Sequence, residues 1–241
     1  MSNLKHNGRL RWAPSYLRNR GQVTRGQKRA MREHWSTYGI RFQHDEVLDL
    51  DQHFPIEGPL LIEIGFGMGD HLIALATALP DHRILGIEVH RPGLAAATGK
   101  ASEQQCENVR LIRGDARLVL TDHLPEAIAQ AVFIQFPDPW PKPGDERRRL
   151  IQPEMLEVLR RTLLPEGECL ITTDVDLYAS HCRDVFDEAP GWETLTQSGW
   201  QAHRITTRYE EKAIAEGRGI TELIFRTNSG FCSNSGEARL S

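Results

Sequence analysis

Short apolar runs alternate along the chain with longer segments in which apolar residues recur at helical spacing. Alternation of this kind is typical of βαβ units, whose right-handed crossovers place parallel strands in one sheet. Thr24 and Gln27 form a capping-box pattern ahead of the first helical segment. The pattern therefore predicts an α/β fold with a mostly parallel sheet. The expected strands span residues 60–64, 84–88, 109–113, 131–136, 167–173, 192–196 and 221–227, and the expected helices span 27–38, 71–79, 92–105, 153–163 and 178–188.

The first residues of the chain differ in charge from the rest. Residues 1–34 contain nine Lys and Arg residues against a single acidic one, Glu33, so they carry a net charge of +8, while the whole chain carries −4. A basic segment on an acidic body is typical of proteins that bind a polyanion, because Lys and Arg release counterions from phosphates; a solvated leader is the alternative. We therefore predict a basic arm with a short helix (1–42), a main domain (43–227) and a flexible tail (228–241).

Composition argues against several functional classes. No apolar run approaches the roughly 20 residues that a membrane-spanning helix needs, and the N-terminus lacks an apolar signal region, so we expect a cytoplasmic protein that does not bind a membrane. The four cysteines are scattered without a Cys-x-x-Cys pair, and the ten histidines include no His-Glu-x-x-His motif. We therefore expect neither a disulfide framework nor a metal site.

A glycine-rich turn follows the expected strand 60–64. Gly65, Gly67 and Gly69 alternate there, and Glu63 stands two residues before the first of them. Dinucleotide sites more often show Gly-x-Gly-x-x-Gly, with a pyrophosphate at the helix N-terminus. Glu63 would oppose such an anion, so the turn disfavours a nicotinamide dehydrogenase and suits a cationic ligand such as S-adenosyl-L-methionine. Glu88 ends the next strand, close to the offset of roughly 20 residues at which an acid meets ribose hydroxyls.

Acidic residues recur near the carboxyl ends of the expected strands. In an open α/β sheet, ligands bind in the crevice beyond those ends, where the strand order changes direction. Any single acid could instead be a helix N-cap, but five together predict one acidic site at this edge. They are Glu63, Glu88, Asp115, Asp138 and Asp174.

Residues 136–141 place Asp138 and Trp140 among three prolines, which stiffen the backbone and present the carboxylate with little ordering cost. A carboxylate beside an aromatic plane suits a flipped purine, because the acid accepts from its N1–H and 2-amino edge while the ring stacks. Lys142 and the three arginines 147–149 follow, and we expect them to meet a phosphate backbone. A rigid turn with Trp140 packed in the core is the alternative.

These motifs, in this order, resemble those of the bacterial tRNA (guanine-N7)-methyltransferases, and the similarity runs from about Ser15 to Arg226. It rests on Ser15-Tyr16-Leu17-Arg18, Thr24-Arg25-Gly26-Gln27, His34-Trp35, Glu63-Ile64-Gly65-Phe66-Gly67-Met68-Gly69, Gly86-Ile87-Glu88-Val89-His90, Phe136-Pro137-Asp138-Pro139-Trp140, Arg148-Arg149-Leu150-Ile151-Gln152-Pro153, Thr173-Asp174 and Thr207-Arg208-Tyr209-Glu210.

The resemblance implies a Rossmann-like class I methyltransferase fold, with about seven strands, the last antiparallel, and helices on both faces. It implies S-adenosyl-L-methionine as methyl donor and a guanine of tRNA, position 46 in the variable loop, as acceptor. By position, the cofactor-binding residues it implies are Glu63, Gly65, Gly67, Glu88, Asp115 and Asp138, of which Asp138 is also catalytic. The substrate-binding residues it implies are Lys142, Asp174, Thr207, Arg208, Tyr209 and Glu210.

The chain departs from the family pattern in three places, the mildest of which is Thr207-Arg208-Tyr209-Glu210 where the family has Thr-Lys-Phe-Glu. After Trp140 the family usually has His-Lys and further basic residues, whereas here residues 141–146 hold Lys142 with Asp145 and Glu146. Val175 stands where the family has a Trp. A diverged paralogue with another purine target and a non-catalytic RNA-binding relative are therefore the alternatives, and the sequence leaves open whether the protein is a monomer or a homodimer.

Overall fold

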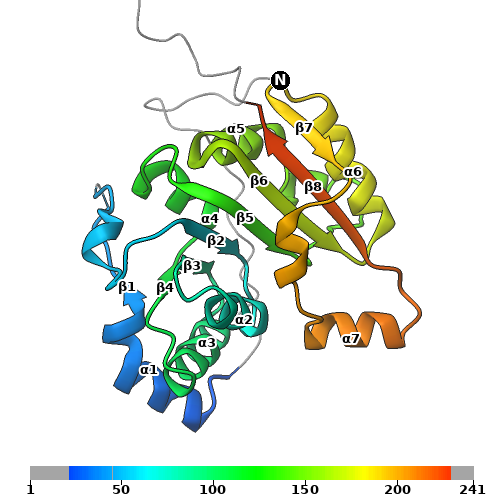
Figure 1. The fold of residues 1–241 in the computed structure, drawn as a ribbon. Coiled ribbons are helices and arrows are strands. Elements are labelled where there is room, and N and C mark those ends of the chain that lie inside the picture. Colours follow the sequence, from blue (N-terminus) through cyan, green and yellow to red (C-terminus); the bar gives the residue numbers. More distant parts are fainter. Residues whose placement is uncertain (1–21, 45, 229–241) are drawn as a thin grey trace, which may run out of the picture.

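The computed structural model describes residues 22–44 and 46–228 and contains one eight-stranded sheet (Figure 1). The strand order is β1-β4-β3-β2-β5-β6-β8-β7, and every pairing is parallel except those of β8 with its two neighbours. The expected α/β fold and all seven expected strands are confirmed. The strands are β1 Gly39–Ile40, β2 Leu60–Ile64, β3 Arg83–Glu88, β4 Val109–Arg113, β5 Ala129–Gln135, β6 Leu163–Thr173, β7 Trp192–Leu195 and β8 Thr221–Thr227.

Helices cover both faces of the sheet because alternate strand residues point to opposite sides. Leu61 of β2 belongs to the core formed with α1, α2 and α3, while its neighbour Ile62 belongs to the core formed with α5 and α6. The long helices are α1 Arg25–Tyr38, α2 Asp70–Ala78, α3 Arg91–Glu103, α5 Pro153–Thr162, α6 Asp176–Asp187 and α7 Arg208–Ala215, and the short ones are α4 Ala116–Leu118, η1 Leu50–Gln52, η2 Val119–His123, η3 Glu146–Arg148 and η4 Gly199–His203.

The described part of the basic arm packs on the sheet domain. α1 begins with the expected capping box, in which Thr24 and Gln27 exchange side-chain and backbone hydrogen bonds. Its last residue, Tyr38, is buried and donates to the carbonyl of Ala101 on α3 at 3.1 Å, and β1 then pairs with β4. Residues 1–21 of the predicted arm and residues 229–241 of the predicted tail lie outside the described residues. The division into arm, domain and tail therefore stays a prediction.

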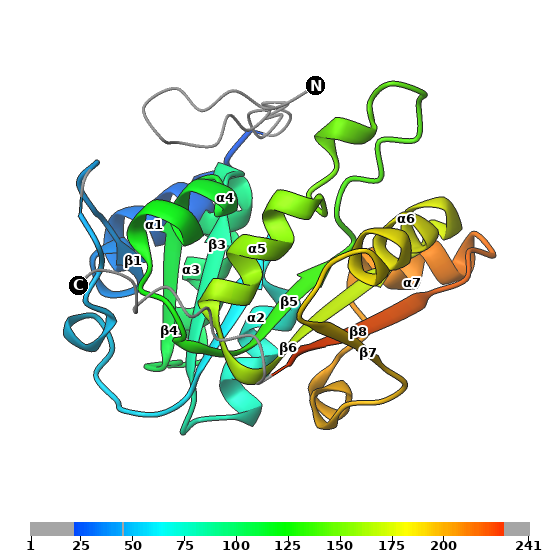
Figure 2. The same ribbon diagram turned by 90° about the horizontal axis from the view of Figure 1, so that it is seen from above.

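The strand order changes direction at β2. From β2 the chain runs through β3 to β4 on one side, and then returns to β5 and β6 on the other. The carboxyl ends of β2 and β5 therefore flank the crevice in which open α/β sheets bind ligands. The segment between β5 and α5 projects beyond the sheet at this edge (Figure 2). Among the described helices, none combines the length and the apolar run that crossing a bilayer requires.

Candidate cofactor and substrate site

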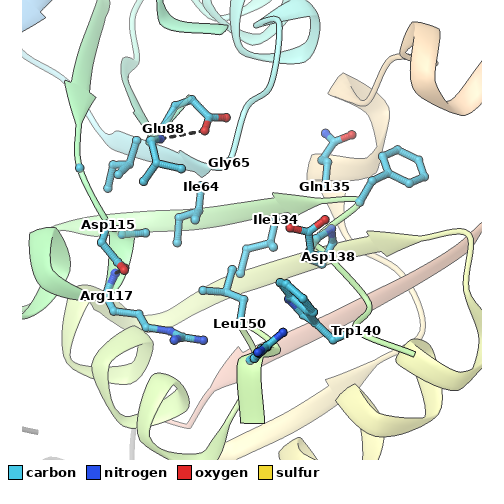
Figure 3. A pocket seen from close by; sticks show the side chains of 17 residues that line it. Ile64, Gly65, Glu88, Asp115, Arg117, Ile134, Gln135, Asp138, Trp140 and Leu150 are labelled. Carbon is cyan, nitrogen blue, oxygen red and sulfur yellow. Dashed lines mark hydrogen bonds between the residues drawn. The ribbon is translucent and has the colours of Figure 1, made fainter. Parts of the chain in front are cut away.

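A hollow of about 270 Å³ lies beyond the carboxyl ends of β2 to β5. Three of the five expected acids, Glu88, Asp115 and Asp138, line it. Figure 3 shows Glu88 and Asp115 on one side of this first hollow and Asp138 with Trp140 on the other. The prediction that strand-end acids converge is thus met by these three side chains.

Apolar side chains line the first hollow between these acids. Ile64 and Ile134 come from the ends of β2 and β5, and Leu150 comes from the chain just before α5. An apolar hollow with a few convergent polar groups is the common form of a small-molecule site. This one can accept a flat ring on the apolar side chains and hydroxyl or amino groups at its rim.

Glu88 ties the glycine turn to the end of β3. One of its carboxylate oxygens accepts from the backbone N–H of Gly67 at 2.9 Å, and the other accepts from Val89 and His90 at 2.7 and 2.9 Å. Burial raises the pKa of the Glu88 carboxyl, and the three N–H donors, which favour the charged form, act against that rise. The carboxylate is therefore both a structural link and part of the wall of the first hollow.

The conformation of the turn and the packing of α3 against it each require glycine. Gly65, Gly67 and Gly69 have φ of 69°, 54° and 78°, in the left-handed region that side chains rarely adopt. In addition, Gly93 of α3 packs so closely on the turn that a Cβ there would lie 2.2 Å from the carbonyl oxygen of Gly67. Residue spacing alone indicated the first reason, whereas the second needs the packed structure.

Asp115 caps the short helix α4, since its side chain accepts from the backbone N–H of Arg117 at 3.0 Å. Arg117 also lines the first hollow, and it is buried, with its guanidinium donating to the carbonyl of Arg149 at 2.7 Å. This cation was not among the expected site residues. The N-cap role and the site role of Asp115 are compatible, because one side chain does both.

Residues 136–140 form a loop with an uncommon backbone conformation. Phe136 and Trp140 have φ of 48° and 41°, which is uncommon for residues with a side chain. Arg149 stabilises this backbone, because its guanidinium donates to the carbonyls of Pro139 and Trp140 at 3.0 and 3.4 Å.

The expectation that all three arginines 147–149 meet a phosphate backbone is therefore wrong for Arg149. Its side chain is buried and holds the loop. Arg148 lies over the ring of Trp140 at 4.9 Å and pairs with Asp145 at 3.2 Å, while Arg147 is exposed. Trp140 lines the first hollow rather than packing in the core.

A second hollow of about 320 Å³ adjoins the first. Glu63 lies here and not in the first hollow, so the four expected cofactor acids divide three and one between two neighbouring spaces. Glu63 is buried and its Oε2 lies 3.0 Å from Nδ1 of His71. The expected substrate residues Thr207, Arg208 and Tyr209 also line the second hollow. The residues common to both hollows are Gly65, Gln135 and Phe136.

Asp174, expected to bind substrate, lines neither hollow. Its side chain is 3% exposed and forms an ion pair with Arg218. The hydroxyl of Tyr209 lies 3.5 Å from the same carboxylate, and the Tyr209 ring packs on Phe136 with centroids 4.9 Å apart. Asp174 thus lies beside Tyr209, which lines the second hollow.

The other two expected substrate residues also lie outside the two hollows. Glu210 is buried and pairs with Arg204 at 2.6 Å, while its backbone N–H donates to Thr207, the N-cap of α7. Lys142 is exposed on the projecting loop. The structure therefore brings together three of the six expected substrate residues and leaves the other three outside both hollows.

The residues present fit S-adenosyl-L-methionine. The apolar side chains suit an adenine ring, carboxylates accept from ribose hydroxyls and amino groups, and the glycine turn permits close approach. An acidic rim favours a sulfonium cation and opposes a pyrophosphate. Among the described residues, no cluster of three or more His, Cys, Asp or Glu side chains could hold a metal ion.

Comparison with solved structures shows the fold, and a family model adds the class. The 16S rRNA methyltransferase KamB matches with a TM-score of 0.59 and 15% identity, covering 79% of this chain and 98% of that one. The aminoglycoside resistance methyltransferase NpmB1 matches with a TM-score of 0.52 and 18% identity, covering 78% and 95%. A family model described as "Putative methyltransferase" matches residues 57–223. The fold is that of a class I, S-adenosyl-L-methionine-dependent methyltransferase.

Sequence relatives identify the family. A tRNA (guanine-N(7)-)-methyltransferase of Aliivibrio salmonicida is 37% identical over 219 residues, which cover 89% of this chain and 92% of the relative. One of Aeromonas hydrophila is 37% identical over 221 residues, covering 90% and 93%. The chain belongs to the tRNA (guanine-N7)-methyltransferase family.

Proposed function

We propose that this protein transfers the methyl group of S-adenosyl-L-methionine to N7 of a guanine in tRNA, at position 46 of the variable loop, in the cytoplasm. The observation that carries the proposal is the convergence of Glu88, Asp115 and Asp138 on one hollow at the switch point of the sheet. The names of the relatives support the choice of tRNA guanine as acceptor.

In this proposal the two hollows hold the cofactor. Glu88 and Asp115 accept from its polar groups in the first hollow, and Glu63 does so in the second. Gly65 and Gly67 let the backbone approach it closely. The cofactor supplies a methyl group on a positively charged sulfur.

Asp138 is the catalytic residue of this proposal. N7 of guanine has an in-plane lone pair and carries no proton, so the reaction needs alignment more than a base. As positive charge develops on the purine, a fixed carboxylate beside it lowers the energy of the transition state. Asp138 is exposed at the rim of the first hollow, next to Trp140, where a purine can reach both.

The substrate residues take two kinds of role in this proposal. Lys142 is exposed and meets a phosphate, while Arg208 and Tyr209 contact the nucleotide at the second hollow. Asp174 and Glu210 are engaged in ion pairs with Arg218 and Arg204, so they act on the substrate by fixing the segment of α7 that contacts it.

Mass spectrometry of nucleosides tests the function directly. tRNA from a strain that lacks the gene should have lost N7-methylguanosine, and a plasmid carrying the wild-type chain should restore it. A plasmid carrying Asp138→Ala should not. Undiminished N7-methylguanosine in the deletion strain would contradict the proposal and favour another purine target.

Binding of S-adenosyl-L-methionine to the purified protein, measured by calorimetry, separates an enzyme from a non-catalytic RNA-binding relative. The proposal requires binding. A protein that binds tRNA and shows no heat with S-adenosyl-L-methionine would be the non-catalytic relative.

A further inference from the structure

Glu63 is held by a histidine that no sequence motif singled out. His71 lies in the first turn of α2, and both side chains are only 2% exposed. Nδ1 of His71 is 3.0 Å from Oε2 of Glu63. Because a carboxylate can only accept a hydrogen bond, Nδ1 is the donor. The contact fixes the Glu63 side chain and uses one of its two oxygens.

The second ring nitrogen of His71, Nε2, differs from Nδ1 in its surroundings. Nε2 of His71 is buried and has no hydrogen-bond partner among the described residues, and the same is true of Oε1 of Gln135. Both residues line a small cavity of about 10 Å³. Glu63 is therefore the one hydrogen-bond partner of the His71 ring among the described residues.

The second hollow offers both signs of charge. Besides Glu63, it is lined by the cations Lys100 and Arg208. Asp70 lines it too, but it forms an ion pair with Lys100, which also donates to the carbonyl of Met68 at 2.9 Å. Glu63 is therefore the carboxylate of this hollow that has no ion pair to a Lys or Arg among the described residues. An amino-acid group, with one ammonium and one carboxylate, is complementary to such a surface.

We propose that His71 is a positioning residue: it fixes Glu63 so that the free carboxylate oxygen accepts from the α-ammonium group of the cofactor's methionyl end. This rests on the proposed function, which places the adenosyl part in the first hollow. The two hollows meet at Gly65, so a ligand with its adenosine in the first reaches the second with its amino-acid end. His71 itself does not contact the reacting atoms.

The test compares two ligands and three substitutions in the full-length protein. S-adenosylhomocysteine carries the amino-acid end, and 5′-methylthioadenosine lacks it. His71→Asn keeps an N–H donor near the position of Nδ1, His71→Gln moves the donor to the position of Nε2, and His71→Leu removes it while keeping an apolar side chain. Dissociation constants for both ligands are measured by calorimetry, and thermal unfolding by circular dichroism reports whether each variant is folded.

The proposal predicts that His71→Leu and His71→Gln weaken S-adenosylhomocysteine binding by about tenfold or more, the effect of losing a hydrogen bond to a charged group. Binding of 5′-methylthioadenosine should change less than about twofold, and His71→Asn should bind both ligands within about threefold of wild type, since its donor is retained. Equal weakening of both ligands would show that His71 only supports the fold and would overturn the inference, as would unchanged S-adenosylhomocysteine binding. A wild-type protein that binds neither ligand would instead overturn the proposed function, and the role of His71 with it.

Discussion

The close approach of α3 to the glycine turn gives a sharp test of how the site is built. Gly93 lies in the first turn of α3, and a Cβ added there would lie 2.2 Å from the carbonyl oxygen of Gly67. An ordinary contact is at least 3.4 Å, so the helix or the turn would have to move by about 1 Å. Gly67 also donates to Glu88. The change Gly93→Ala should therefore disturb both the turn and the acid that it holds.

Gly99 provides a matched control on the same helix. A Cβ at Gly99 would meet only the Cβ of Ala30, at 3.4 Å. Gly99→Ala should therefore stabilise the protein by about 0.5–1 kcal/mol, the usual gain from replacing a glycine inside a helix. Gly93→Ala should destabilise it by about 2–3 kcal/mol, at the upper end of overpacking costs because a backbone carbonyl cannot rotate away.

The two variants should thus differ by about 2.5–4 kcal/mol, or roughly 5–16 °C in melting temperature for a chain of this size. Thermal and urea unfolding followed by circular dichroism measure this difference. Calorimetry with S-adenosylhomocysteine should show at least about tenfold weaker binding for Gly93→Ala, as expected from the loss of one hydrogen bond to the Glu88 carboxylate, and no change for Gly99→Ala. Equal stability and equal binding of the two variants would refute the claim that this close approach builds the site.

Three further predictions concern charge. Asp138→Ala should lower turnover by about 100-fold and change S-adenosylhomocysteine affinity far less, because its role is in the transition state; equal losses in kinetic and binding assays would make it a cofactor ligand only. Burial raises the pKa of Glu88 above its ordinary value, and only the ionised form accepts all its hydrogen bonds, so affinity should fall with decreasing pH earlier than for an exposed glutamate. Calorimetry across acidic pH should show this fall in the wild type, and a persisting fall in Glu88→Gln would assign it to another group. Replacing the exposed Arg25, Lys28 and Arg32 with alanine should weaken tRNA binding. It should also flatten the slope of log Kd against log salt by about 0.7–0.9 for each phosphate that is no longer neutralised. An unchanged slope would exclude α1 from the RNA interface.

The sheet could be predicted from the sequence because its strands are apolar runs bounded by turn residues. The expected bounds of β2, β4 and β8 match those observed. β1 was not predicted because its two residues pair with β4 without an apolar run of their own. α7 was not predicted either, although Thr207 and Glu210 have the spacing of a capping box and Thr207 is the N-cap of this helix. That signal was available and could have placed the helix.

Roles that depend on tertiary contacts could not be predicted from local sequence. A basic run is typical of an RNA-binding surface, yet Arg149 turns inward to the carbonyls of the loop before it. His71 is one of ten histidines, and only the packing of α2 against β2 reveals its contact with Glu63. The burial of a side chain and its hydrogen-bond partners depend on elements far apart in the chain. The location of an acid at the end of a strand depends only on the strand that carries it.

The projecting loop indicates how charge for RNA binding is distributed in this chain. Asp145 pairs with Arg148, and Arg149 is buried, so Lys142 and Arg147 are the exposed cations of residues 141–149. α1 presents four exposed basic side chains, at positions 25, 28, 29 and 32, on a helix packed against α3, and among the described residues Glu33 is the one acid that pairs with them, through Arg29 and Arg32. α3 begins directly after the end of β3, where Glu88 lines the first hollow. A polyanion that reaches the hollow from the α1 side meets more positive charge than one that reaches it over the loop. Alanine substitutions on α1 should therefore weaken tRNA binding more than Lys142→Ala does.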